Sequence, residues 1–195
     1  FGAWRTGLHV RDGRLGDGTL ESRATPVQIA TNVRKISAGS GHGLIILQDG
    51  TMWAFGLNYS GQLGDGTYSS RITPVQIDLD VAEVSAGGEH SAFIKTDGTL
   101  WSMGRNYTGA LGDGTTTTRN TPVLIAGGVQ SVSAGHNCKL YVDTDGKLWG
   151  TGDNNHGQLG NGGYSSLISP VLIADSVAQA IAGTDFSLII RTDGS

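Results

Sequence analysis

The sequence predicts an all-β protein, a β-propeller of four-stranded antiparallel blades. The first observation is a motif at residues 61–67, Gly-Gln-Leu-Gly-Asp-Gly-Thr, that recurs with small changes and at a constant spacing at 13–19, 109–115 and 157–163. A fixed period of this length is typical of solenoids, propellers and other repeat arrays. The second observation is that each period contains about four short strand-like segments, and the third is that no stretch has a sustained helical period. Four strands per unit is the composition of a propeller blade, whereas a parallel β-helix would have shorter repeats and fewer hairpins.

The first half of each unit is predicted to be two strands and a hairpin turn. In the second copy, residues 33–39 alternate apolar and polar side chains and end in small residues, which is typical of a strand that leads into a tight bend. Residues 42–47 are an apolar run of the length of a buried strand. Asp49-Gly50 then predicts a hairpin turn, because glycine accepts the positive φ that the turn requires.

The second half of the unit is a return strand, a loop and a further strand. The return strand occupies residues 52–55, a polar loop begins at residue 57, and Thr73-Pro74 opens the last strand, because proline favours a strand start or a sheet edge. The same features recur in the other copies: Asp-Gly turns at 97–98, 145–146 and 193–194, and tryptophans at Trp53, Trp101 and Trp149. The chain is therefore expected to be a single propeller domain or fragment (1–195) with repeats at roughly 1–29, 30–77, 78–125, 126–173 and 174–195, of which the first and last are parts of blades.

The two ends of the chain are compatible with either a closed ring or an open arc of blades. Phe1-Gly2 resembles Phe55-Gly56, the end of a return strand, which would place about six extra residues before Gly13; in an alternative alignment, residues 7–13 are a displaced strand and turn. The ends could pair to complete one blade and close a ring, or the chain could be an arc of a larger propeller. A start without methionine and a stop within the motif favour the arc.

The composition indicates a folded chain without a basic or a membrane-spanning signature. Glycine contributes 32 of 195 residues, charged residues only 15%, and the net charge is -4. A nucleic-acid partner is not expected, because nucleic-acid binding leaves a basic footprint. The sequence contains no long apolar run that predicts a membrane span and no signal peptide. The lone Cys138 rules out an intramolecular disulfide framework.

The combined motifs resemble the regulator-of-chromosome-condensation repeat. The likeness is carried by Ser-Ala-Gly at 37–39, histidine at 42 and 90, Asp-Gly-Thr-x-Trp at 49–53 and 97–101, Phe-Gly-x-Asn-x-x-Gly-Gln-Leu-Gly-Asp-Gly-Thr at 55–67, and Thr-Pro-Val-Gln-Ile at 73–77. The resemblance implies a propeller of four-stranded blades, usually seven, of which four copies are just over half. The short regular repeats look like those of bacterial members, for which secretion or the cell envelope is the expected location.

Members of this family do different things, and protein binding is their shared theme. One nuclear member promotes nucleotide exchange on the GTPase Ran and docks on chromatin. A plant member senses ultraviolet light through clustered tryptophans, and a secreted bacterial member inhibits β-lactamase. Because a fold alone does not fix function, the resemblance leaves the partner of this chain open.

A catalytic site in a repeat protein should break the repeat symmetry, because repeats supply scaffold. His42 and His90 share one repeat position, which favours a structural role. His136 and His156 are off-register but have no nearby Ser, Cys or acid at a recognisable spacing, and no catalytic triad or HExxH pattern occurs. We therefore predict a non-enzymatic protein with no catalytic, metal-binding or cofactor-binding residues. The rival, a hydrolase or lyase, would need three or more symmetry-breaking polar groups in one pocket.

Several repeated residues are predicted to be structural. Asp17, Asp65 and Asp113 each precede an arginine by six residues, so each carboxylate is expected to bond to loop N–H groups or to that arginine. The regular spacing of the tryptophans favours blade packing over a light-sensing cluster. Asp-Gly turns and the repeated loop asparagine explain the acidic segments 143–146 and 153–155, which lack the distant Glu of a calcium loop. A calcium-stabilised extracellular module is kept as an alternative.

Partner binding is predicted where the repeat fails or where loops carry aromatic residues. The candidates are Trp4, Arg5, His9 and Arg11 in the first copy, and the loop tyrosines Tyr59 and Tyr107, since loops carry function and Tyr and Trp anchor protein interfaces. The predicted function is a protein–protein interaction scaffold, with an unidentified protein or the remaining blades of a longer chain as partner. The alternative that the resemblance suggests is a guanine-nucleotide exchange factor for a small GTPase.

Overall fold

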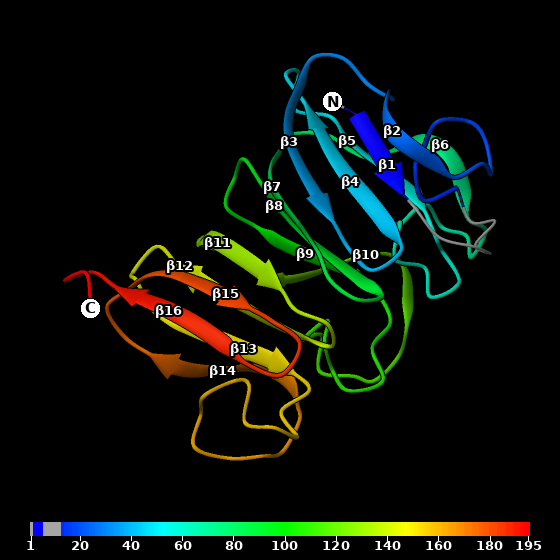
Figure 1. Ribbon diagram of the computed structural model, residues 1–195. Helices are drawn as coiled ribbons and strands as arrows, with labels where there is room; N and C mark the ends of the chain where they lie inside the picture. The colour runs from blue at the N-terminus through cyan, green and yellow to red at the C-terminus, as the bar shows by residue number, and fades with distance from the viewer. Residues whose placement is uncertain (1, 6–12) are drawn as a thin grey trace.

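The computed structural model describes residues 2–5 and 13–195, with side chains from residue 13 onwards. Within these ranges all regular structure is β-strand, and the strands form three four-stranded and two two-stranded sheets. Figure 1 shows the sheets following one another in chain order along an arc. The all-β propeller class predicted from the sequence is confirmed.

Each complete sheet consists of four consecutive antiparallel strands, so that neighbours in sequence are neighbours in the sheet. The first comprises β3 (Val33–Ala38), β4 (His42–Leu47), β5 (Met52–Gly56) and β6 (Arg71–Asp78). The second comprises β7 (Val81–Ala86), β8 (His90–Lys95), β9 (Leu100–Gly104) and β10 (Arg119–Ala126). The third comprises β11 (Val129–Ala134), β12 (Cys138–Asp143), β13 (Leu148–Gly152) and β14 (Leu167–Ala174).

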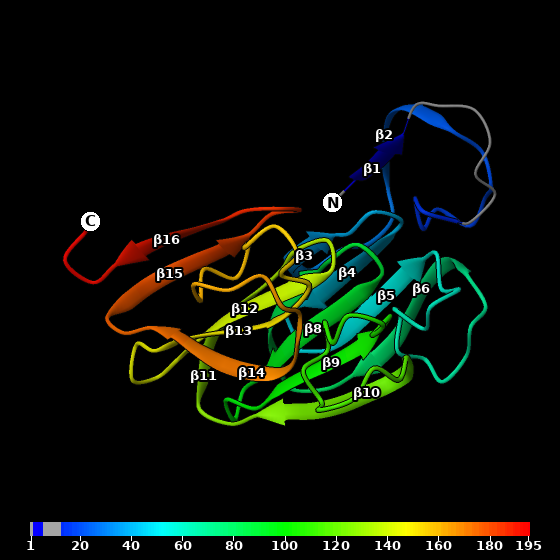
Figure 2. The ribbon, with the colours of Figure 1, turned by 90° about the horizontal axis from the view of Figure 1, so that it is seen from below.

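The two outer sheets are incomplete. At one end β1 (Gly2–Arg5) pairs with β2 (Arg23–Gln28), and at the other β15 (Val177–Ala182) pairs with β16 (Ser187–Arg191). These are separate sheets, and Figures 1 and 2 show them at opposite ends of the arc. In this structure, therefore, the two ends do not join into one blade.

The register of β1 corrects the sequence alignment of the first repeat. Arg5 lies opposite Arg23, and in the first complete sheet Gly56 lies opposite Arg71, which is the repeat equivalent of Arg23. Arg5 thus takes the place of Gly56, and the expected equivalence of Gly2 with Gly56 is wrong. The loop after β1 is three residues longer than the loop after β5, not six. The match of two residues, Phe-Gly, gave the wrong alignment, because the register of a strand depends on its pairing along the whole length.

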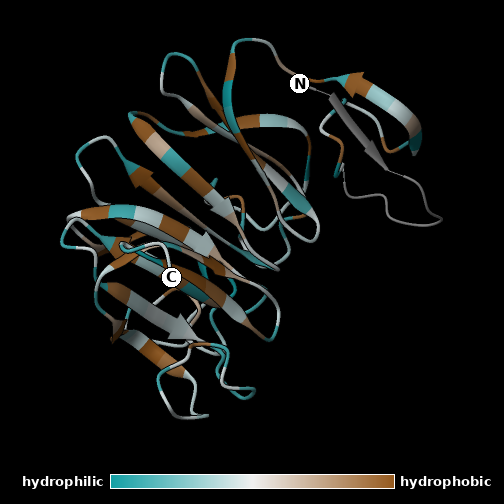
Figure 3. Ribbon diagram, turned by 60° about the vertical axis from the view of Figure 1, so that its left-hand side comes forward, coloured by the Kyte–Doolittle hydropathy of each residue, from teal (hydrophilic) through white to brown (hydrophobic). Residues whose placement is uncertain are grey.

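The hydrophobic core lies between neighbouring sheets. One cluster joins Leu44 and Met52 of the first complete sheet to Val84, Phe93 and Met103 of the second, all of them buried. Figure 3 shows apolar residues concentrated in bands along the strands and hydrophilic residues in most of the loops. Because each sheet buries its faces against the next, the repeats stabilise one another, as in other repeat proteins. None of the described residues belongs to a helix that could cross a membrane.

The first strands of successive sheets are joined through the serine of the Ser-Ala-Gly motif. The backbone N–H of an alanine in the next sheet donates to each serine hydroxyl, at 2.9 Å from Ala86 to Ser37, 2.9 Å from Ala134 to Ser85 and 3.0 Å from Ala182 to Ser133. The neighbouring glycine permits this approach, because a Cβ on Gly87 would lie 2.5 Å from the carbonyl oxygen of Gly135. The motif therefore acts as a contact between blades.

The repeated tryptophans pack within the sheets. The ring of Trp101 lies nearly parallel to that of Phe93 with centroids 6.5 Å apart, and Trp149 lies in the same way against Tyr141 at 6.3 Å. The indole N–H of Trp53 donates to the hydroxyl of Thr51 at 2.9 Å. Each ring thus buries apolar surface while its polar atom has a partner, which is the packing role expected from the spacing.

Candidate protein-binding face

Three equivalent loops, at residues 57–70, 105–118 and 153–166, follow the third strand of each complete sheet. Because the strands run in the same order in every sheet, these loops emerge on the same side of the arc, as Figure 1 shows. We call this side the loop face. It carries most of the repeated motif and the two tyrosines that the sequence singled out.

A buried asparagine organises each loop. The Asn58 amide group donates to the Asp65 carboxylate at 3.0 Å and to the carbonyl oxygens of Thr67 and Ser69, both at 3.1 Å. Its Oδ1 accepts from the backbone N–H of Leu63 at 3.0 Å. Asn58 is fully buried, so every polar atom of its side chain is used inside the loop. These hydrogen bonds hold the backbone of the loop in place.

The same network recurs in the other two loops with small changes. Asn106 donates to Asp113 at 3.0 Å, and Asn154 donates to Asn161 at 3.0 Å. The backbone N–H of the loop leucine again donates to the asparagine Oδ1, from Leu111 to Asn106 at 2.9 Å and from Leu159 to Asn154 at 3.0 Å. The third loop thus keeps its shape although an amide replaces the carboxylate.

An arginine pairs with the loop carboxylate in three copies. Arg71 binds Asp65 at 2.5 Å, Arg119 binds Asp113 at 2.8 Å, and Arg23 binds Asp17 at 3.0 Å. Burial raises the pKa of Asp65, but hydrogen bonds from Thr67 and from Arg71 outweigh it, so its pKa lies below the usual value. The carboxylates are therefore ionised and engaged within the loop, as the Asp–Arg spacing in the sequence predicts.

The loop face exposes large aromatic side chains on these rigid loops. Tyr59 is 69% exposed, Tyr107 68% and Tyr164 72%, although each loop is otherwise fixed by its own hydrogen bonds. The Arg105 guanidinium lies 4.9 Å from the centre of the Tyr107 ring and 3.3 Å from the Glu89 carboxylate. A pre-positioned exposed tyrosine can bury a large area on a partner at little entropic cost.

Polar contacts join neighbouring blades along this face, and their chemistry changes from one junction to the next. Ser60 donates its hydroxyl hydrogen to Glu89 at 2.9 Å, and the equivalent Thr108 donates to the carbonyl oxygen of Asn137 at 3.2 Å. At the next junction the His156 ring lies 3.7 Å from the Asp185 carboxylate. The loops of the face thus share one shape, while the polar groups at the junctions between them differ. A protein partner can recognise these differences.

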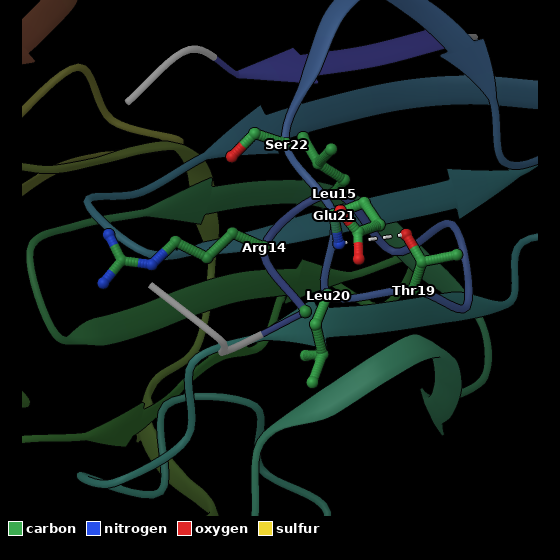
Figure 4. A pocket seen from close by; sticks show the side chains of 7 residues that line it. Arg14, Leu15, Thr19, Leu20, Glu21 and Ser22 are labelled. Carbon is green, nitrogen blue, oxygen red and sulfur yellow. Dashed lines mark hydrogen bonds between the residues drawn. The ribbon is translucent and has the colours of Figure 1, made fainter. Parts of the chain in front are cut away.

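The candidate residues of the first repeat are only partly described. Trp4 and Arg5 belong to β1, where the backbone alone is described, and His9 and Arg11 lie outside the described residues. The same holds for most of the displaced strand considered at 7–13. The adjoining loop has a hollow of about 20 Å³, lined by Gly13 to Leu15 and Thr19 to Ser22 (Figure 4). This volume admits about one water molecule and no larger ligand.

The two repeated histidines are buried between blades. The His42 Nε2 atom lies 2.8 Å from the Ser91 hydroxyl, which donates to the carbonyl oxygen of Gln62 at 2.8 Å. Burial lowers the pKa of His42 to about 4, and burial together with the nearby Lys139 ammonium lowers the pKa of His90 to about 3. Both rings are therefore neutral near pH 7 and lie inside the fold, which favours the structural role that their shared position suggests.

Sequence reasoning missed a buried lysine. Lys139 has no exposed surface, and its ammonium donates to the Ser102 hydroxyl and, at 2.7 Å, to the carbonyl oxygen of Leu111. The equivalent positions hold Gly43, Ser91 and Ser187. A charged residue within the apolar run 138–142 was the available signal. No group of three or more potential metal ligands occurs in the part of the chain that the structure describes.

Consecutive four-stranded sheets joined by repeated loops define this protein as a repeat-built β-propeller. The chain belongs to the regulator of chromosome condensation (RCC1) repeat family, whose repeat matches residues 49–94, 97–142 and 145–190, and, in a second description, 33–62, 81–110 and 129–158. No curated protein matches the chain.

Solved structures of similar fold support this assignment. Human WBSCR16 has a TM-score of 0.80 and 26% identity over 94% of this chain and 52% of its own. Prp20p from Saccharomyces cerevisiae, described with its binding to Gsp1p and histones, has a TM-score of 0.78 and 22% identity over 96% and 50%. Yeast RCC1 (Prp20) bound by Kap60 gives 0.79 and 22% over 95% and 48%. This chain thus spans about half the length of these proteins, and at 22% identity the likeness shows the fold alone.

Proposed function

We propose that this chain is a non-enzymatic scaffold that binds a protein partner through its loop face. The observation that carries the proposal is the set of exposed tyrosines on internally bonded loops: Tyr59, Tyr107 and Tyr164, with exposed fractions of 69%, 68% and 72%. Large aromatic residues held in place are the side chains from which interface hot spots are most often built. The sequence candidates Trp4, Arg5, His9 and Arg11 stay predictions from the sequence within the same proposal.

The polar contacts of the face support a protein partner. Arg105 and Glu89 place both signs of charge beside Tyr107, and the His156 ring lies near the Asp185 carboxylate. An aromatic centre with a mixed-charge rim is the usual composition of a protein interface, whereas a nucleic-acid interface would be predominantly basic. The varied rim would give selectivity, and the rings would supply most of the affinity.

The test compares two sets of substitutions. A triple variant, Tyr59→Ser, Tyr107→Ser and Tyr164→Ser, removes the three most exposed tyrosines of the loop face and keeps Tyr68, which is 51% exposed. The control, Leu79→Ser with Leu124→Ser, changes side chains that are 53% and 52% exposed in other parts of the blades. Proteins that the native chain captures from its source cells should be lost from the first variant and kept by the control. Equal capture by all three proteins would refute the proposal, provided that the melting temperatures agree.

A nucleotide-release assay addresses the exchange-factor alternative. The native chain is incubated with small GTPases of its source organism loaded with a labelled guanine nucleotide. The scaffold proposal expects release at the spontaneous rate. Accelerated release that the tyrosine variant abolishes would replace the scaffold with an exchange factor acting through the same face.

A further inference from the structure

Two tripeptides on the loop face match the acceptor sequence for N-linked glycosylation, in which serine or threonine stands two residues after asparagine. They are Asn58-Tyr59-Ser60 and Asn106-Tyr107-Thr108. An acceptor tripeptide of this kind normally indicates a surface loop whose asparagine is open to modification. Both loops do lie on the surface, since Tyr59 and Tyr107 are 69% and 68% exposed. The accessibility of the two asparagines therefore decides whether the tripeptides act as acceptors.

The two asparagines point into their loops. Asn58 and Asn106 are both 0% exposed, although the next residue of each loop is a largely exposed tyrosine. The atom that receives the sugar is the amide nitrogen Nδ2, and a transferase has to reach it. In the folded loop this atom is out of reach, while its neighbour in sequence is open to solvent.

The hydrogens of each amide nitrogen already have acceptors inside the loop. Asn106 Nδ2 donates to the Asp113 carboxylate at 3.0 Å and to the carbonyl oxygens of Thr115 and Thr117 at 2.9 and 3.1 Å, as Asn58 does in its own loop. In the transfer, Nδ2 forms a bond to the anomeric carbon of a sugar that is linked to a lipid pyrophosphate. The bond from that carbon to the pyrophosphate oxygen breaks, and one amide hydrogen leaves as a proton.

The product of this transfer does not fit the folded loop. The modified nitrogen keeps one hydrogen where the loop uses two, so at least one buried acceptor loses its donor. The sugar would also stand where the buried carboxylate and carbonyl groups now lie. Glycosylation of Asn58 or Asn106 therefore requires that the loop is open.

The hydroxyl groups of the two tripeptides are held by the following sheet. Ser60 donates to the Glu89 carboxylate at 2.9 Å, and Thr108 donates to the carbonyl oxygen of Asn137 at 3.2 Å. An enzyme that recognises the tripeptide needs the asparagine and the hydroxyl residue together. In the folded chain the first is bonded inside the loop and the second to a neighbouring sheet, so recognition has to break both sets of contacts.

The burial of these asparagines does not depend on how the chain continues, because both loops lie against complete sheets. The backbone N–H of Gly66, in the first loop, donates to the carbonyl oxygen of Asn120 on β10 at 2.9 Å. The N–H of Gly114, in the second loop, donates in the same way to Ile168 on β14 at 2.9 Å. Both of these strands belong to described four-stranded sheets.

The third loop separates the structural role of the asparagine from the acceptor sequence. Asn154 is also 0% exposed and makes the same bonds within its loop. The tripeptide Asn154-Asn155-His156 has no hydroxyl residue and is not an acceptor. The buried asparagine is thus present with and without an acceptor sequence, so its hydrogen bonds and not its modification account for it.

We propose that folding closes both acceptor tripeptides, so that Asn58 and Asn106 accept an N-linked oligosaccharide in the unfolded chain and not in the folded one. The modification state of these residues then records whether the loops had formed when the transferase met the chain. This property goes beyond the binding function proposed above and needs no partner for the loop face.

The test uses the folded full chain, a purified oligosaccharyltransferase and an oligosaccharide linked to a lipid pyrophosphate. The matched control is Asp49→Asn at the exposed hairpin turn of the first complete sheet. It creates an acceptor tripeptide with Thr51, whose hydroxyl already bonds to the side chain at position 49 at 2.7 Å. The unfolded reference is the peptide of residues 36–71 of this variant, released by cleavage after Lys35 and Arg71, which contains both sites.

Mass spectrometry of proteolytic fragments gives the rate of glycosylation at each site. The control site should react in the folded variant. Asn58 should react at least about a hundredfold more slowly in the folded chain than in the peptide, because the reaction has to wait for local opening of the loop. Asn106 should be protected in the folded chain in the same way. An unchanged melting temperature shows that Asp49→Asn leaves the fold intact.

Three results would overturn the proposal. The first is glycosylation of Asn58 or Asn106 in the folded chain at the rate of the control site, because burial would then give no protection. The second is an unreactive control site in the folded variant, because something other than burial would then exclude the enzyme. The third is an unreactive Asn58 in the peptide, because the tripeptide would then not be an acceptor even when unfolded.

Discussion

Lys139 makes one blade junction chemically different from the others. At the junction before it, Ser91 donates its hydroxyl hydrogen to the carbonyl oxygen of Gln62, and at the junction after it Ser187 does the same to Gln158. Lys139 instead reaches across to Ser102, where the preceding sheet has Ala54. Two positions have thus changed together: lysine replaces the serine of the neighbouring repeats, and Ser102 replaces the equivalent of Ala54, because a buried ammonium needs an additional hydrogen-bond acceptor.

The first prediction concerns the pH dependence of stability at this lysine. Burial lowers the pKa of Lys139 to about 7 from 10.5, and the Asp113 carboxylate only partly opposes it. Between these values the unfolded chain holds a proton that the folded chain has released, so stability should rise with pH across this window. Below about pH 7 both states are protonated and this contribution is constant. Urea unfolding of the native chain and of Lys139→Met at several pH values measures the difference.

The informative quantity is the difference in the free energy of unfolding between the native chain and the Lys139→Met variant. Burial also raises the pKa of Cys138 to about 11, which makes stability fall at high pH in both proteins and cancels in the comparison. His90 faces the lysine but is neutral throughout the window, since its pKa is about 3. Lys139→Met combined with Ser102→Ala avoids an orphaned hydroxyl. Parallel stability curves for the native and variant proteins would contradict a depressed lysine pKa.

At the scale of the element, the loop after each third strand is held by its asparagine more than by its ion pair. Asn58 is fully buried and bonds to four groups of its loop. The Arg71 side chain is 38% exposed but the Asp65 side chain only 4%, so the ion pair can be lost at little cost only when both residues are replaced. The third loop provides a natural comparison, because it keeps Asn154 while Asn161 and Leu167 replace the ion pair. The loop shape survives that replacement.

The second prediction follows from this contrast. Asn58→Ala orphans several buried groups and should lower the free energy of unfolding by about 3 kcal/mol, since each unsatisfied group costs about 1–3 kcal/mol. Asp65→Asn combined with Arg71→Leu, the pair of residues that the third loop carries, removes the ion pair without leaving a buried charge and should cost less than about 1 kcal/mol. Urea denaturation of the two variants provides the measurement. An equal loss in both would mean that the ion pair contributes as much as the asparagine, which would contradict this account.

The elements show which parts of the structure the sequence could predict. Period and turn chemistry were enough to place the strands and to pair Asp65 with Arg71, because both depend on residues close in sequence. The register of β1 was not predictable, since Phe1-Gly2 matches Phe55-Gly56 locally while the pairing of Arg5 with Arg23 spans a loop. Lys139 was missed because its acceptors, Ser102 and Leu111, lie 37 and 28 residues away in sequence.

At the scale of the whole molecule, stability should be uneven along the arc. The second and third complete sheets each share buried clusters with the sheets on both sides, whereas the sheet of β15 and β16 shares one with the third sheet alone among the described residues. In repeat proteins the stability of a unit is approximately its own contribution plus those of its neighbour interfaces. A sheet with two strands and one interface should therefore open more readily than a four-stranded sheet with two.

The third prediction is a gradient of amide hydrogen exchange. The amides of β16 should exchange faster than those of β12 by about a hundredfold or more, because local opening free energies range from near zero up to the global value. Leu188 is 62% exposed, whereas Leu140, its equivalent in β12, is 1% exposed. The measurement uses the native chain, with β12 of the same molecule as the internal reference. Equal protection of β16 and β12 in dilute solution would contradict the one-interface account, because β16 would then be as stable as a strand inside the arc.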